Sequence, residues 1–140
     1  MKGSLLYLES SALVKLVWSE PESDALRTLL TKWPDRVSSD LVHVEVIRAA
    51  RRGRASTTTI LEGRAREVIA AVNLLAITEE VLELAAMVEP DGLRSLDAIH
   101  LASALAMGSD LGAMVTYDVA LASAARAAGI EVLAPGAQST

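Results

Sequence analysis

Hydrophobic positions along the chain follow two alternating patterns. Short continuous apolar runs, such as Leu5–Leu8, are typical of strands buried on both faces of a parallel sheet. Longer segments in which apolar residues recur every three or four positions are typical of amphipathic helices. The first pattern predicts strands over residues 5–8, 36–39, 73–78, 113–116 and 131–133. The second predicts helices over residues 12–18, 23–33, 40–52, 56–72, 78–88, 95–107 and 118–128.

Polar residues and glycines at the predicted boundaries support these elements. Serine, threonine and aspartate side chains cap helix N-termini, and glycine or proline commonly follows a helix. The predicted N-caps are Ser10 or Ser11, Ser23, Asp40, Thr78 and Ser95. The predicted stops are Pro34, Gly53, Gly108 and Gly129, and Pro90-Asp91-Gly92 is predicted to be a turn.

The alternation of strands with helices indicates the fold class. It predicts an α/β fold: a three-layer α/β/α domain with a central, mainly parallel sheet of about five short strands. No internal repeat or linker divides the sequence, so residues 1–140 are interpreted as a single domain. The tail over residues 135–140 is expected to be loose.

Composition excludes several classes of protein and site. A chain of 140 residues that is 51% hydrophobic and 22% charged is expected to fold as one domain. Because it contains no cysteine and only His43 and His100, disulfide scaffolds and thiolate zinc sites are excluded, and a histidine-rich zinc site is not expected. A bound metal would be held mainly by carboxylates, which suits Mg²⁺ or Mn²⁺.

The apolar runs are far too short to span a bilayer, although the mean hydropathy is +0.35. Glu9 interrupts the first run, so the N-terminal residues do not resemble a signal peptide. The sequence is therefore expected to belong to a cytoplasmic protein with no membrane partner.

Charge is distributed unevenly along the chain. The net charge is −5, yet residues 1–70 carry +2 and residues 71–140 carry −7. Six arginines fall between Arg48 and Arg66. A basic patch in an acidic protein can mark a phosphate-binding surface. On the patch alone, a solvated helix face is the simpler interpretation.

Four acidic residues occupy unusual positions. Glu9 and Asp118 follow predicted strands, at the sheet edge where parallel α/β folds bind ligands. Glu45 and Asp97 fall on helix faces whose neighbouring positions are apolar. A buried carboxylate must be paired, neutralised or bound to a cation, because an isolated buried charge is costly.

Structural pairing is the alternative for each acid. Arg48 lies three residues after Glu45, and Arg94 lies three residues before Asp97, so ion pairs on a helix are possible for both. Arg94 could equally hold a substrate phosphate.

The sequence resembles the PIN domain family over nearly its whole length. The run Leu6-Tyr7-Leu8-Glu9-Ser10-Ser11-Ala12 is similar to the family's opening strand and acid. Ser38-Ser39 with Val44-Glu45-Val46 is similar to the second motif, and the run 93–102 to the third. Residues 115–121 and 132–136 match the fourth motif and the usual ending. The compact length is similar to that of VapC-type toxins of bacterial toxin–antitoxin pairs.

The resemblance implies a Mg²⁺- or Mn²⁺-dependent endoribonuclease that is neutralised by a cognate VapB-like antitoxin. It also implies a homodimer, which can enter a larger toxin–antitoxin assembly. The catalytic and metal-binding residues that it implies are Glu9, Glu45, Asp97 and Asp118. Ser11 and Thr116 match positions that orient the acids or a water, or that form capping or strand-end hydrogen bonds. Arg94 and Arg48 are the candidates for contact with RNA.

Glu9 departs from the family, which usually has aspartate at this position. The extra methylene moves the carboxylate by about 1.5 Å, which a metal site does not accept without adjustment. The alternative is therefore a catalytically weakened PIN domain that binds RNA or protein. An unrelated aspartyl phosphotransfer domain fits poorly, because Glu9 is not aspartate and no lysine follows Lys32.

Three other side chains have two interpretations each. His100 lies one helical turn after Asp97, and is interpreted as a hydrogen-bonded structural histidine rather than a metal ligand or an RNA contact. Trp18 and Trp33 are expected to pack in the core. Their alternative role is to line an apolar groove for a partner's helix. His43 is given no role.

Overall fold

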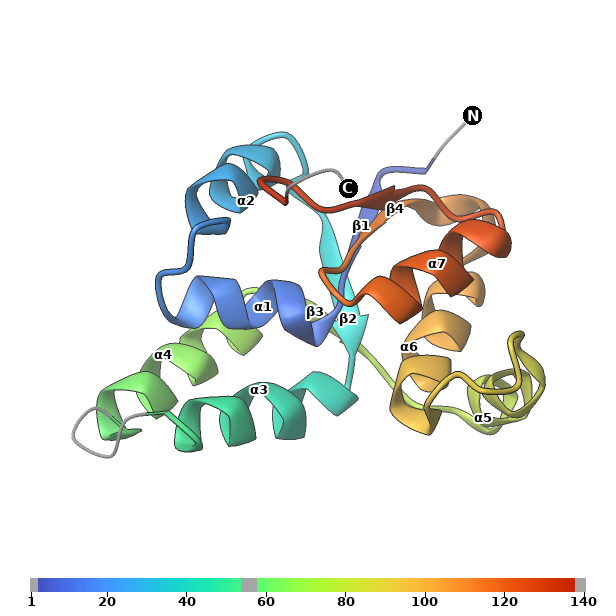
Figure 1. Ribbon diagram of the computed structural model, residues 1–140, viewed down its shortest axis with the longest axis horizontal. Helices are drawn as coiled ribbons and strands as arrows, with labels where there is room; N and C mark the ends of the chain where they lie inside the picture. Colours follow the sequence, from blue (N-terminus) through green and yellow to red (C-terminus); the bar gives the residue numbers. More distant parts are fainter. Residues whose placement is uncertain (1–2, 54–57, 138–140) are drawn as a thin grey trace.

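The computed structural model describes residues 3–53 and 58–137, which form an α/β/α sandwich (Figure 1). Five parallel strands lie in the order β3-β2-β1-β4-β5. The strands are β1 Leu5–Leu8, β2 Arg36–Ser39, β3 Asn73–Leu75, β4 Leu111–Val115 and β5 Val132–Leu133. The helices are α1 Ser10–Val17, α2 Ser23–Leu30, α3 Leu41–Arg51, α4 Thr58–Ala70, α5 Glu79–Met87, α6 Ser95–Leu105 and α7 Val119–Ala127, with the short 3₁₀ helix η2 Gly108–Asp110 before β4. The predicted fold class is confirmed.

Two hydrophobic cores form because successive strand side chains point to opposite faces of the sheet. Leu6 and Leu8 of β1 face a core built with α1, α2, α3 and α4. Tyr7, between them, faces a second core with α6 and α7, on which Leu93 and Val88 also pack. Figure 1 shows the same division, with α1–α4 on one side of the sheet and α5–α7 on the other.

Two of the side chains expected at helix starts do act as caps. The Thr78 hydroxyl accepts a hydrogen bond from the Val81 amide, at 3.2 Å. The Asp118 carboxylate accepts one from the Leu121 amide, at 3.0 Å. These bonds satisfy amides that the first helical turn leaves without a partner.

The other predicted caps are wrong. Ser10, Ser11, Ser23 and Ser95 lie inside their helices, and Asp40 at the start of α3 makes no capping bond. The Ser23 hydroxyl donates instead to the Lys15 carbonyl at 2.7 Å, and Ser10 and Ser11 donate to the Glu9 carboxylate. At α3 the amide of Leu41 is satisfied by the Ser39 hydroxyl, at 3.1 Å.

Some boundaries are shorter than predicted. Helix α2 ends at Leu30 rather than at residue 33, and β3 spans three residues rather than six. The Trp33 ring packs against the first core and lies over Gly112 in β4, where a Cβ atom would come within 2.5 Å of it. Its expected core role is confirmed.

The segment after β5 is held in place over residues 135–137, contrary to the expectation of a loose tail. The Tyr117 hydroxyl donates to the Pro135 carbonyl at 2.7 Å, and the Ala137 amide donates to the Ala134 carbonyl. Residues 138–140 lie outside the described residues.

Within residues 3–53 and 58–137, the structure has no helix with the length and apolar character needed to cross a membrane.

Candidate active site

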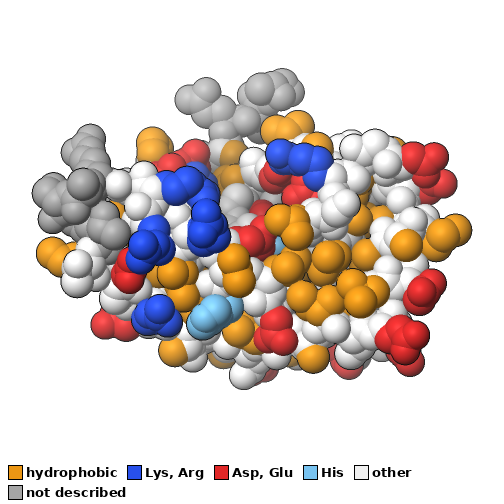
Figure 2. Space-filling view, turned by 90° about the horizontal axis from the view of Figure 1, so that it is seen from below, with side chains coloured by type: hydrophobic (Ala, Val, Ile, Leu, Met, Phe, Trp, Pro, Cys, Tyr) orange, Lys and Arg blue, Asp and Glu red, His pale blue; other side chains and the backbone are white. Residues whose placement is uncertain are grey.

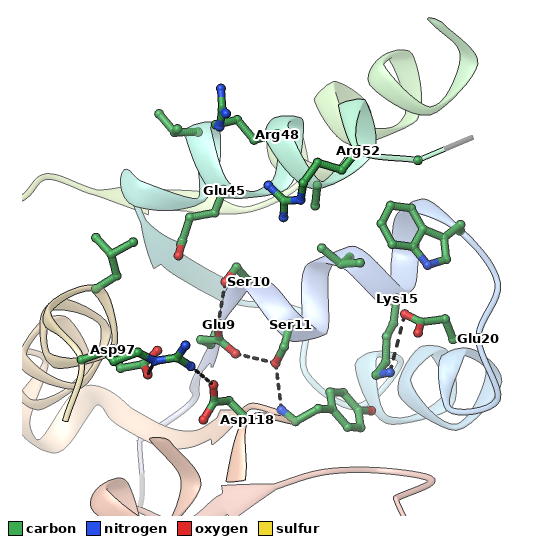
Figure 3. Close-up of a pocket in the computed structure, with 18 of the residues that line it drawn as sticks. Glu9, Ser10, Ser11, Lys15, Glu20, Glu45, Arg48, Arg52, Asp97 and Asp118 are labelled. Atoms are coloured by element: carbon green, nitrogen blue, oxygen red, sulfur yellow. Dashed lines mark hydrogen bonds and ion pairs between the residues drawn. The ribbon is translucent and has the colours of Figure 1, made fainter. Parts of the chain in front are cut away.

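All four predicted acids line one cavity, of about 970 Å³, at the carboxyl edge of the sheet (Figure 3). Glu9 directly follows β1, and Asp118 follows the neighbouring strand β4. Glu45 comes from α3 and Asp97 from the first turn of α6. The fold therefore brings four segments that are far apart in the sequence to one place.

The carboxylate of Glu9 is buried and accepts hydrogen bonds from three hydroxyl groups. Ser10 donates to Oε2 at 2.7 Å, and Thr116 donates to Oε1 at 2.7 Å. Ser11 also donates to Oε1, and its oxygen accepts the Tyr117 amide proton at 2.8 Å. Neutral donors thus replace the water that the side chain, 4% exposed, has lost. The structure places both predicted supporting residues on this carboxylate.

Asp97 and Asp118 share the guanidinium of Arg94. Arg94 Nη2 lies 3.3 Å from Asp118 Oδ2, and Arg94 Nε lies 3.5 Å from Asp97 Oδ2. That oxygen of Asp97 is buried and accepts no hydrogen bond in the described structure. Burial, followed by the nearby charge of Asp118, raises the pKa of Asp97, and Arg94 opposes the shift. Asp97 is therefore a carboxylate whose charge is incompletely compensated.

Glu45 is paired with His100 rather than with Arg48. His100 Nε2 and Glu45 Oε1 are 2.7 Å apart, and His100 Nδ1 lies 2.7 Å from the Tyr7 hydroxyl. The tautomer that satisfies all three groups has Nε2–H donating to the carboxylate and the tyrosine donating to Nδ1. His100 is fully buried, and it is the hydrogen-bonded structural histidine that the sequence indicated.

Three helices begin at this cavity. Glu9 and Asp118 occupy the N-cap positions of α1 and α7, and Asp97 lies in the first turn of α6. The positive end of a helix dipole stabilises a nearby carboxylate by about 0.3–1 kcal/mol. Backbone amides at these three helix starts therefore contribute positive potential to the acidic cavity.

Basic side chains line the cavity on the side of α1 and α3. Arg48, Arg52 and Lys15 belong to its lining. In Figure 3, Arg52, which directly follows α3, points into the cavity, whereas Arg48 points away from the acids. Figure 2 shows lysine and arginine side chains gathered beside a hollow in the face seen there, with acidic side chains close by. Phosphates could lie along this wall.

The basic segment 48–66 is only partly directed to the cavity. Arg51 instead pairs with Glu62 on α4, at 2.6 Å. Arg64 and Arg66 do not line the cavity, and Arg54 lies outside the described residues.

Trp18 packs against the first core, as expected, and also lines the cavity. Sequence reasoning missed Arg52 and Lys15 as lining residues. The spacing offered a signal for Arg52, because residues 45, 48, 49 and 52 recur at intervals of three or four on one face of α3. Lys15 is 8% exposed and is held by Glu22 at 3.1 Å, which lowers the pKa of Glu22.

The donor chemistry of the cavity fits a hard divalent cation, although the side chains are not yet arranged around one. Carboxylates surround a buried oxygen of Asp97 that lacks a hydrogen-bond donor. In the described part of the chain, however, no three acidic or histidine side chains are placed to hold a metal together. Arg94 occupies the space between Asp97 and Asp118, and the Glu9 oxygens are engaged by hydroxyls.

Comparison with known proteins identifies the family of the chain. The PIN domain family model matches residues 6–127. Ribonuclease VapC46 of Mycobacterium tuberculosis is 45% identical over 131 residues, covering 93% of this chain and 97% of the relative. Ribonuclease VapC47 of the same species is 43% identical over 138 residues, with 95% and 98% coverage.

Solved structures share the fold at lower identity. FitAcB from Neisseria gonorrhoeae superposes with a TM-score of 0.75 at 15% identity, covering 93% of this chain and 97% of that one. VapC20 of Mycobacterium tuberculosis, described as a sarcin-ricin loop cleaving toxin, gives 0.68 at 18% identity, with 89% and 95% coverage. The family match and the two close relatives, taken with the fold, show that this chain belongs to the PIN domain family, as one of its VapC-type members.

Proposed function

We propose that the protein is a metal-dependent endoribonuclease toxin of a toxin–antitoxin pair, acting in the cytoplasm. The observation that carries the proposal is the convergence of Glu9, Glu45, Asp97 and Asp118 on one cavity, with a buried oxygen of Asp97 lacking a hydrogen-bond donor. The ribonuclease names of relatives at 43–45% identity support RNA as the substrate.

The metal that this set of donors favours is Mg²⁺ or Mn²⁺. Asp97 and Asp118 would hold it, with Glu9 and Glu45 contributing directly or through water. When bound, such an ion lowers the pKa of a coordinated water and neutralises charge on the phosphate. Hydrolysis then adds water across one phosphodiester P–O bond of the RNA.

The remaining side chains orient and bind. Ser11 and Thr116 fix the Glu9 carboxylate, and His100 fixes that of Glu45. Arg52, and more weakly Arg48, would bind phosphates on either side of the bond that is cut, since phosphate contacts position RNA without reading its sequence.

A catalytically weakened binding module is the second candidate. The observation that favours it is the engagement of both Glu9 oxygens by Ser10, Ser11 and Thr116. A carboxylate held in this way has little freedom to turn toward a metal. RNA would then bind along the cavity without being cut.

Cleavage of a pool of structured RNAs by the purified, antitoxin-free protein separates the two functions. We expect cleavage with Mg²⁺ or Mn²⁺, none in EDTA, and a loss of at least about 100-fold in Asp97→Asn, as for other groups that act at the reacting centre. Glu9→Asp keeps the charge and shortens the side chain. Activity that appears only in Glu9→Asp would support the weakened module, and cleavage that persists in EDTA would exclude the metal-dependent mechanism.

Two protein partners belong to the proposal. Structural neighbours include a toxin–antitoxin complex from Klebsiella pneumoniae and VapBC2 from Rickettsia felis. We propose a cognate antitoxin that inhibits cleavage by placing a basic side chain in the acidic cavity, and a homodimer of the toxin. Sedimentation of the toxin alone, against the 14.8 kDa expected for a monomer, and with its antitoxin measures both assemblies.

A further inference from the structure

The guanidinium of Arg94 lies within ion-pair distance of both Asp97 and Asp118. Its Nη2 is 3.3 Å from Asp118 Oδ2, and its Nε is 3.5 Å from Asp97 Oδ2. The same Asp97 oxygen is the buried atom that accepts no hydrogen bond in the described structure. Arg94 therefore compensates the charge of this oxygen without satisfying its hydrogen-bonding capacity.

The backbone fixes where this side chain starts but leaves its end free. Arg94 is the N-cap residue of α6, and its carbonyl accepts the Ala98 amide at 2.8 Å. Asp118 is the N-cap residue of α7, so Arg94 connects the starts of two helices that both border the cavity. The Arg94 side chain is 78% exposed, so it can swing into solvent without breaking any core contact.

The contacts of Arg94 are those of a weak competitor. Both distances exceed the 2.7–2.9 Å usual for a strong charge-assisted hydrogen bond. An exposed ion pair of this kind adds little stability. A divalent cation carries twice the charge and approaches carboxylate oxygens more closely, so it binds the same two carboxylates more strongly than Arg94 does.

We propose that Arg94 is the resident counter-ion of Asp97 and Asp118: it holds them when no divalent cation is bound, leaves when one binds, and so lowers the affinity of the cavity for metal. Arg94 is a tuning residue rather than a catalytic one. The inference rests on the proposed metal-dependent function.

Mn²⁺ binding to the RNA-free protein tests the proposal without measuring activity. Free Mn²⁺ is followed by electron paramagnetic resonance at fixed ionic strength for the parent protein, Arg94→Gln and Arg52→Gln. Arg52 is the matched control, because it lines the same cavity and contacts neither Asp97 nor Asp118. We expect Arg94→Gln to bind Mn²⁺ about tenfold more tightly, and Arg52→Gln to change the affinity by less than about threefold.

Three results would overturn the proposal. Equal affinities in Arg94→Gln and the parent would mean that the arginine does not compete. Weaker binding in Arg94→Gln would mean that it positions the acids for the metal. A similar gain in Mn²⁺ affinity in Arg52→Gln would mean that the loss of any positive charge near the cavity has this effect.

Failure of the proposed function gives a different pattern from failure of this inference. In that case neither the parent nor Arg94→Gln binds Mn²⁺, and RNA cleavage, where it occurs, is insensitive to EDTA. Melting in EDTA verifies the fold of each variant. Because Arg94→Gln should bind Mn²⁺ more tightly, we expect Mn²⁺ to raise its melting temperature more than that of the parent.

Discussion

Asp97 shows how a single residue can serve a site at the expense of the metal-free fold. The residue is 8% exposed, and burial and the charge of Asp118 raise its pKa above the ordinary value of 3.8. The folded protein therefore binds this proton more tightly than the unfolded chain does. Ionised Asp97 destabilises the fold above its folded-state pKa, and the cost disappears below 3.8, where both states are protonated.

Replacing this carboxylate by an amide should therefore stabilise the protein. In EDTA at pH 7, we expect Asp97→Asn to raise the melting temperature by about 3 °C, the shift that about 1 kcal/mol produces in a chain of this size. The gain should shrink as the pH falls through the folded-state pKa of Asp97 and vanish below 3.8. Calorimetry over this pH range measures it, and Asp91→Asn, at an exposed turn, is the control. A lower melting temperature for Asp97→Asn at pH 7 would contradict this interpretation.

Glu9 shows what one residue of sequence could and could not reveal. The sequence showed its place after a buried strand, the neighbouring Ser10 and Ser11, and a side chain one methylene longer than aspartate. How this longer carboxylate is held depends on the hydroxyl of Thr116, 107 positions away in the sequence. That juxtaposition is a property of the β1–β4 pairing, which no local pattern specifies.

At the scale of elements, one hydrogen-bonded chain joins three parts of the fold. Tyr7 of β1, His100 of α6 and Glu45 of α3 are linked by two contacts of 2.7 Å. Helices α3 and α6 cover opposite faces of the sheet, so the chain connects the two outer layers beside the cavity. It also fixes the direction of Glu45.

Removing the histidine should break both contacts together. We expect His100→Leu to lower the free energy of unfolding by about 2–3 kcal/mol, because it leaves the Tyr7 hydroxyl and the Glu45 carboxylate without their partner. Combining it with Tyr7→Phe should cost about 1 kcal/mol less than the sum of the single changes, since the unpaired hydroxyl is gone. Urea unfolding measures this coupling.

Tyr117→Phe is the matched control for that pair. Tyr117 also loses one hydroxyl bond, to the Pro135 carbonyl, and this bond is unconnected to His100 in the described structure. Its effect should add to that of His100→Leu. Full additivity between Tyr7→Phe and His100→Leu would show that the chain does not act as a unit.

Element order was largely readable from the sequence, and element starts were not. The alternation of strands and helices follows from periodicity alone, as does the spacing of Glu45 and Arg48 on α3 and of Arg52 just after it. The serine caps failed because Ser10 donates to the Glu9 carboxylate and Ser23 to the Lys15 carbonyl, rather than accepting a bond from a first-turn amide of its own helix. A hydroxyl can choose among several acceptors, and only the assembled fold determines which one is near.

On the scale of the whole molecule, the net charge of −5 gives no indication of a polyanionic substrate. The relevant quantity is the local field at the cavity, which is lined by Arg48 of α3 and by Arg52 just after that helix, together with the four acids. A charge that lies within about a Debye length of the RNA backbone acts on it, and more distant acids are screened. Binding should therefore depend on salt through a small number of arginines.

That dependence counts the arginines directly. RNA binding is measured in EDTA on an Asp97→Asn background, with a single-stranded oligonucleotide over a range of salt concentrations. For single strands, each phosphate that a basic residue neutralises contributes about −0.7 to the slope of log K against log salt concentration.

We expect Arg52→Gln to reduce the magnitude of this slope by about 0.7. Arg48→Gln should reduce it by less, because the Arg48 side chain points away from the acids. Arg126→Gln, in the last turn of α7 at the end away from the cavity, should leave it unchanged. An equal reduction of the slope in all three variants would mean that RNA binding responds to overall charge, and that Arg48 and Arg52 do not bind the RNA phosphates directly.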